Sequence, residues 1–294
     1  MNKIYPLSST AWAALLVVGS LAIAGCSTTG GQGVSAGNSA NDEEESRSIG
    51  STTNLASLSD VVARNPNDPQ VFNMRGTVLA RTGRTQEALA DFSRAIQIDP
   101  NYTQAYSNRA LVQRRLGRTD LALSDYNRAI TADPNYGPAF VGRGNIYRVS
   151  GRVGEAISDY NRAIQINGSN PQAFHNRGLA YQTQNNHRQA IEDFTTALGL
   201  APANPEPYLG RAQSYMAIGD AKLALEDLNE AAQFAPSNPD IWNARGRALE
   251  ALGDNERALG SYSKAMTVDE YNSTARDGFA RLGGRPGQTY RLFN

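Results

Sequence analysis

The sequence predicts an all-α solenoid of six tandem helix pairs. Three observations support this prediction. A 34-residue pattern returns six times without insertion between residues 69 and 272. Positions 8, 20 and 27 of every copy are glycine or alanine, and position 4 is always aromatic. These spacings place the conserved residue classes on one face of each of two helices. One such pair buries too little apolar surface to fold alone, so neighbouring pairs must stack.

The elements follow the repeat in order. The copies span residues 69–102, 103–136, 137–170, 171–204, 205–238 and 239–272. An N-capping side chain precedes proline at the first helical position in four copies: Asp68, Asn170, Asn204 and Asn238. The first helix is expected to end at position 15, which carries residues that tolerate a left-handed backbone: Gly83, Gly117, Gly151, Asn185, Gly219 and Gly253. A second helix should then run through positions 20, 24 and 27.

In period and residue classes this pattern resembles the tetratricopeptide repeat. The resemblance implies a right-handed superhelix whose concave groove is lined mainly by positions 2, 5, 9, 12 and 13. It also implies a protein-binding role without catalysis. One position departs from the common family pattern, because position 7 is arginine in every copy where the family usually has leucine.

Sixteen residues after that arginine, the second helix carries an aspartate in five copies and Ser261 in the sixth. The expected pairs are Arg75 with Asp91, Arg109 with Asp125, Arg143 with Asp159, Arg177 with Asp193, and Arg211 with Asp227. We favour a structural row of half-buried, bidentate ion pairs. The alternative is a ladder that binds phosphate or carboxylate groups of a ligand.

Residues 1–25 are expected to be a signal peptide, with a basic start and a short apolar segment. The sequence Ile23-Ala24-Gly25-Cys26 resembles the lipobox of bacterial lipoproteins, and Cys26 is the only cysteine in the chain. The resemblance implies acylation of Cys26 and a lipid anchor. Ser27 in place of Asp suggests the outer membrane, facing the periplasm. The alternative is an ordinary secretory signal with an incidental cysteine.

The segments flanking the repeats have separate predictions. Residues 26–54 are rich in Ser, Thr, Gly and Asn, which is typical of a flexible tether. Residues 55–68 and 273–284 are expected to form capping helices at the two ends of the stack. The tail, residues 285–294, is either a disordered end or a peptide that docks on the solenoid, and we favour disorder.

Charge is distributed unevenly along the repeats. The whole chain holds 28 basic and 28 acidic residues. The first three repeats hold 13 basic and 8 acidic residues, whereas the last three hold 8 and 13. Such opposed halves favour oriented docking of a polar partner or head-to-tail self-association. The balance does not indicate nucleic-acid binding, which needs a strongly basic domain.

The family's groove positions identify candidate partner-binding residues here: Asn73, Arg81, Arg114, Arg115, Asn145, Arg148, His175 and Gln182. The arginines suit an acidic or extended segment of a partner protein, although they are also compatible with a solvated helix surface. No nucleophile–base constellation, phosphate-binding glycine loop or metal-ligand cluster stands in the sequence, so we expect no enzymatic activity, cofactor or metal.

These features together predict a lipid-anchored adaptor of the bacterial cell envelope. The architecture resembles outer-membrane lipoproteins that assist the assembly of pili and secretion pores. It also resembles lipoprotein adaptors for peptidoglycan-remodelling enzymes, and direct binding of envelope polysaccharide or peptidoglycan is a further alternative.

Overall fold

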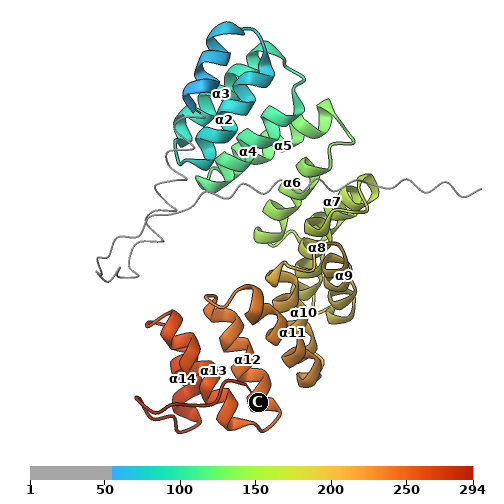
Figure 1. Ribbon diagram of the computed structural model, residues 1–294. Helices are drawn as coiled ribbons and strands as arrows, with labels where there is room; N and C mark the ends of the chain where they lie inside the picture. The colour runs from blue at the N-terminus through green and yellow to red at the C-terminus, as the bar shows by residue number, and fades with distance from the viewer. Residues whose placement is uncertain (1–54, 294) are drawn as a thin grey trace, which may run out of the picture. The chain divides into compact units, whose positions relative to one another are not determined.

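The computed structural model describes residues 55–293, and its regular structure over this range is entirely α-helical (Figure 1). Residues 55–64 are helical and precede the first repeat. Six pairs follow: α2 (Pro69–Arg81) with α3 (Thr85–Ile98), α4 (Thr103–Arg115) with α5 (Thr119–Ala132), α6 (Gly137–Val149) with α7 (Val153–Ile166), α8 (Pro171–Thr183) with α9 (His187–Leu200), α10 (Pro205–Ala217) with α11 (Ala221–Phe234), and α12 (Pro239–Ala251) with α13 (Asn255–Val268). The short helix α14 (Ser273–Arg281) closes the series.

The local signals that end each helix are satisfied in the structure. The side chains of Asp68, Asn170, Asn204 and Asn238 accept hydrogen bonds from backbone N–H groups in the first turns of α2, α8, α10 and α12. At the other end of the first helices, Asn185 has a φ of 59°, and Gly83 has a φ of 78°. These left-handed residues allow the sharp turn into the second helix, as the sequence predicts.

The core of each repeat is built around the large residue at position 24. Phe194 on α9 is fully buried against two glycines, Gly178 on α8 and Gly210 on α10 of the next repeat. A Cβ atom at Gly178 would lie 2.9 Å from the ring, and one at Gly210 would lie 2.7 Å from it. The two glycines therefore leave the space that the Phe194 ring fills. Burying such a ring contributes about 2 to 3 kcal/mol.

Helix contacts give the stack its direction of curvature. First helices of successive repeats, such as α4 and α6, approach each other, whereas within residues 55–293 the second helices of successive repeats do not. The first helices therefore line the inner side. The predicted all-α superhelical solenoid of six helix pairs is confirmed.

Both ends of the stack are covered by a helix. Leu55 packs with Leu79 and Phe92 of the first repeat. On α14, Phe279 joins the core formed by the last two repeats. The helix ends at Arg281, and Gly283 adopts a φ of 74°, so the helical part of this cap is shorter than the 273–284 boundaries.

The tail corrects one expectation. Residues 285–293 do not form a disordered end: Tyr290 and Leu292 pack against the last core, and Phe293 lies against Trp242. The signal peptide, the tether and Cys26 lie outside the described residues. Over residues 55–293, no helix has both the length and the apolar character required to span a membrane.

Candidate protein-binding groove and arginine row

The arginine at position 7 and the aspartate at position 23 form a repeated ion pair. In the fourth repeat, Arg177 Nε and Nη2 donate to the two carboxylate oxygens of Asp193, at 2.8 and 2.6 Å. The other four predicted pairs have the same bidentate geometry, with donor–acceptor distances of 2.7 to 2.9 Å. Asp193 is buried, and the Arg177 side chain is 19% exposed. The carboxylate is therefore held inside the repeat.

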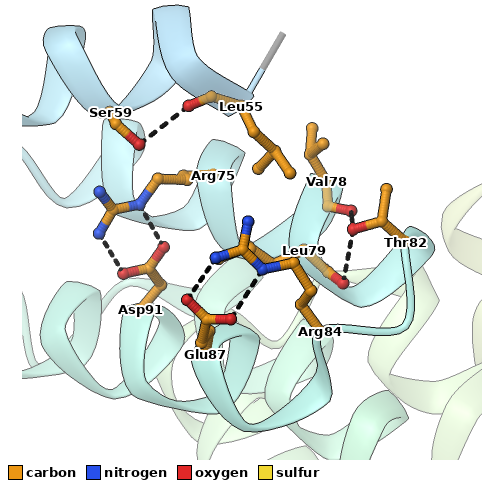
Figure 2. A network of polar contacts seen from close by, with 9 residues as sticks. All are labelled: Leu55, Ser59, Arg75, Val78, Leu79, Thr82, Arg84, Glu87 and Asp91. Atoms are coloured by element: carbon orange, nitrogen blue, oxygen red, sulfur yellow. Dashed lines mark hydrogen bonds and ion pairs between the residues drawn. The ribbon is translucent and has the colours of Figure 1, made fainter. Parts of the chain in front are cut away.

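The first repeat shows the pair close to the end of the stack (Figure 2). Arg75 grips Asp91 with two bonds of 2.7 Å. Beside it, Arg84 forms a second bidentate pair with Glu87, but both of these side chains are about half exposed. The two pairs share one geometry in different surroundings, which makes them a natural comparison for stability.

A third arginine contact, which the repeat pattern did not lead us to expect, links neighbouring repeats. The Nη1 group of position 7 donates to the residue at position 25 of the preceding repeat, which is Ser93, Asn127, Asn161 or Thr195 in turn, at 2.6 to 2.9 Å. The signal was present in the sequence, because position 25 is always polar. These arginines donate their hydrogen bonds to other residues of the stack, which favours the structural interpretation over a ligand-binding ladder.

Three of the candidate groove residues come together in one place. Arg114, Arg115 and Asn145 line a cleft of about 340 Å³ with Thr119, Ile146, Val149 and Ser150. The cleft lies between the C-terminal ends of the first helices α4 and α6 and includes Thr119 at the start of α5. Over residues 55–293, neither Arg114 nor Arg115 forms an ion pair or a hydrogen bond through its side chain.

Two buried tyrosines lie beside these arginines. Burial raises the pKa of Tyr126 and of Tyr160 to about 12, and the positive charge of Arg114 opposes this rise at both phenols. The Tyr160 hydroxyl donates to Asn145 Oδ1 at 2.8 Å, which orients the Asn145 amide. Both phenols are therefore neutral at pH 7, and the positive charge at the cleft comes from Arg114 and Arg115, which line it.

Arg148 and His175 continue the polar lining toward the fourth repeat. Arg148 is half-buried, and its Nε has no hydrogen-bond partner within the described residues. The His175 side chain is 10% exposed, and its Nε2 lies 3.7 Å from a Glu206 carboxylate oxygen. Burial lowers the pKa of His175, with Arg148 acting in the same direction and Glu206 opposing. His175 is therefore neutral at pH 7 and supplies polarity to the groove without charge.

The remaining candidates have other surroundings. Asn73 accepts a 2.9 Å hydrogen bond from Asn108 of the next repeat. Gln182 donates from one nitrogen to the Gly210 carbonyl oxygen at 2.7 Å and to Ser214 Oγ at 2.8 Å. Both side chains therefore connect first helices to each other. Arg81 is exposed on α2 and does not line the cleft. In the part of the chain that the structure describes, no group of three or more His, Cys, Asp or Glu side chains is arranged to hold a metal ion.

Comparison with protein families places the repeats within one family. Sequence models described as tetratricopeptide repeat or TPR repeat match residues 68–135, 144–185, 175–239 and 209–272. A comparison with the curated proteins finds no significant match.

Solved structures with the same fold come from several settings. The chain is similar to one in the APC/C hetero-tetramer Cut9–Hcn1, with a TM-score of 0.69 and 17% identity over 76% of this chain, which spans 44% of that one. It is similar to pilF of Pseudomonas aeruginosa, with a TM-score of 0.67, 20% identity, and coverage of 74% of this chain and 99% of that one. For PilW, described as a type IV pilus biogenesis factor, the TM-score is 0.66 and the identity is 17%, over 71% and 97% of the two chains. At these identities the likeness concerns the fold.

Proposed function

Because the chain belongs to the tetratricopeptide repeat family, we propose that it is a non-enzymatic adaptor that binds a segment of a partner protein in its inner groove. The observation that carries the proposal is the cleft formed by Arg114, Arg115 and Asn145. Within residues 55–293, its two arginines form no ion pair, and they stand beside the Asn145 amide that Tyr160 orients. Solvated arginines of this kind gain most from a ligand that brings carboxylates to them.

The chemistry of the cleft favours an acidic, extended segment. An extended chain presents alternate side chains to one surface, so two carboxylates could face Arg114 and Arg115 while its backbone runs past Asn145. Charge-assisted hydrogen bonds contribute about 1.5 to 3 kcal/mol each. The basic balance of the first three repeats would also guide an acidic segment toward this half of the groove.

The finer function that we propose is an envelope adaptor anchored through lipid on Cys26, at the outer membrane and facing the periplasm. The lipobox-like sequence supports the anchor. A role in pilus or secretion assembly is supported by the similarity to pilF and to PilW, a type IV pilus biogenesis factor. An adaptor for peptidoglycan remodelling is the competing outcome, and the experiment below includes it.

The test is capture of partners by the full chain from its native membrane, after crosslinking, with a charge-reversed groove. The variant is R114E/R115E. Arg148 is left unchanged, because a carboxylate at its half-buried position would disturb the fold. The matched control, R128E/R188E, makes the same charge change at exposed sites on the second helices α5 and α9.

We expect one predominant protein to be captured by the wild type and by the control, and to be lost with R114E/R115E. Equal capture by all three forms would refute the groove as the docking site. A parallel sedimentation with purified sacculi separates the two functions. An adaptor for proteins stays in the supernatant, whereas sedimentation of the purified chain would favour peptidoglycan binding. A deletion strain with normal surface fibres would refute the pilus role.

A further inference from the structure

The sixth repeat departs from the other five at two adjacent positions. Position 23 is Ser261, where the others have aspartate, and position 22 is Gly260, where the others have Ala, Ser or Glu. Because position 23 lacks an aspartate, Arg245 has no carboxylate there with which to form the bidentate pair. Instead its Nη1 donates to Ser261 Oγ at 2.6 Å, and its Nε donates to Asn229 Oδ1 at 2.8 Å.

The C-terminal tail takes the place of the missing carboxylate. Arg245 Nη2 donates to the main-chain carbonyl oxygen of Leu292 at 2.6 Å. The Phe293 ring lies over the same guanidinium, with 4.7 Å from the Arg245 carbon to the ring centroid, and it meets Trp242 edge to face at 6.3 Å. Arg245 is 1% exposed, so this contact removes its charge from water.

Gly260 makes the approach of the tail sterically feasible. A Cβ atom at this position would collide with the carbonyl oxygen of Arg291. Because that oxygen belongs to the backbone, the tail would have to move away. The two departures in repeat six therefore act together, since one provides room for an extended backbone and the other frees an arginine donor for its carbonyl group.

Further contacts fix the register of the tail. The Tyr290 ring meets Phe279 of α14 edge to face at 5.4 Å, and its hydroxyl accepts a 2.7 Å hydrogen bond from Arg285 N. Arg291 lies 3.8 Å from a Glu256 carboxylate oxygen. Aromatic residues on both sides of one main-chain anchor allow the site to distinguish one short sequence from another.

We propose that this face of α12 and α13 is a second peptide-binding site, separate from the inner groove. Its ligand is an extended segment with the pattern Tyr-Arg-Leu-Phe, and the chain's own C-terminal segment occupies it as an internal ligand. The guanidinium of Arg245 donates a hydrogen bond to the backbone carbonyl group of the ligand. Trp242 contacts the phenylalanine of the pattern, and Phe279 contacts its tyrosine.

The test uses the full chain with its own tail disabled by Y290A/F293A, and a fluorescein-labelled peptide of residues 285–294. We expect the peptide to bind this variant, as measured by fluorescence anisotropy. For a peptide with a Kd of about 100 μM, binding to the wild type should be about tenfold weaker, because the tethered tail competes at an effective concentration on the order of 1 mM. Failure of the peptide to bind the tail-disabled chain would overturn the proposal.

Two further substitutions test the geometry in the tail-disabled chain. G260A should abolish peptide binding by occupying the space of the Arg291 carbonyl. S261D should weaken it at least tenfold, because Arg245 would then pair with an internal carboxylate, as in the other five repeats. Far-ultraviolet circular dichroism confirms that each variant is folded. The control G154A, at a helix glycine where the added Cβ atom would meet no other part of the structure within 4 Å, should leave binding unchanged. Unchanged binding with G260A would also overturn the proposal.

Discussion

Arg177 and Asp193 are joined by two parallel hydrogen bonds of 2.8 and 2.6 Å, and the aspartate is buried. Removing the carboxylate leaves a half-buried guanidinium without its counter-charge. We expect D193A to lower the free energy of unfolding by roughly 3 kcal/mol, the low end for a broken buried pair, because Arg177 keeps some exposure to solvent. Urea denaturation followed by circular dichroism measures this change.

The control for that prediction is the exposed pair of Arg84 and Glu87, which has the same bidentate geometry. E87A should alter stability little, because solvent screens an exposed pair. Equal losses for D193A and E87A would contradict the view that burial makes the arginine row important.

The contact between repeats predicts a smaller loss of stability, together with a loss of folding cooperativity. N161A removes the acceptor that Arg177 Nη1 reaches at 2.6 Å. We expect a loss of about 1 kcal/mol. Because the bond spans two repeats, the unfolding transition should also broaden as their coupling weakens. The substitution Q165A, at an exposed position on the same helix α7, should leave the width of the transition unchanged.

Close packing at Phe194 predicts that a smaller side chain at this position compensates for larger residues at the two neighbouring glycines. G210A places a Cβ atom 2.7 Å from the Phe194 ring and should destabilise the chain by about 1 to 3 kcal/mol. In the fifth repeat, the equivalent positions carry a leucine and two alanines, because Leu228 packs in a core that includes Ala212 and Ala244. The double variant G178A/G210A should also lower the free energy of unfolding. Adding F194L should therefore recover much of that loss. A double-mutant analysis of the unfolding free energies decides whether the changes are coupled.

The buried phenols predict a loss of stability at high pH. The pKa of Tyr126 is raised to about 12 in the folded chain, against 10 for an exposed tyrosine. Between these values the unfolded state releases the proton and the folded state keeps it, so the stability contributed below pH 10 falls as the pH rises. The expected slope is about 1.4 kcal/mol per pH unit. The comparison is urea unfolding of wild type and Y126F at pH 9 and pH 11, where equal slopes would contradict the prediction.

Most of the fold follows from the sequence because the repeat presents the same physical signals six times. The proline and asparagine caps and the left-handed residues such as Asn185 act within one turn of helix, so they can be recognised locally. The groove was harder to assign. Position within the repeat indicates which face Asn73 and Gln182 occupy, but their hydrogen bonds to neighbouring repeats depend on the spacing between helices.

The tail shows the opposite situation. Its contacts with Arg245 occur once and join residues 47 positions apart, so no period reveals them. The sequence did contain a clue, because Gly260 and Ser261 are adjacent exceptions to an otherwise regular pattern. In a repeat protein, two neighbouring exceptions, one that opens space and one that frees a hydrogen-bond donor, therefore indicate a candidate contact site.

The arginine at position 7 donates a hydrogen bond to position 25 of the preceding repeat, and this bond joins two adjacent helices. It stays between 2.6 and 2.9 Å whether the acceptor is the short hydroxyl of Ser93 or the longer amide of Asn127. Since the bond length is nearly constant, we expect a longer acceptor side chain to hold the two helices further apart. Exchanging serine and asparagine at position 25 would then alter the pitch of one turn of the spiral while leaving its apolar interior untouched.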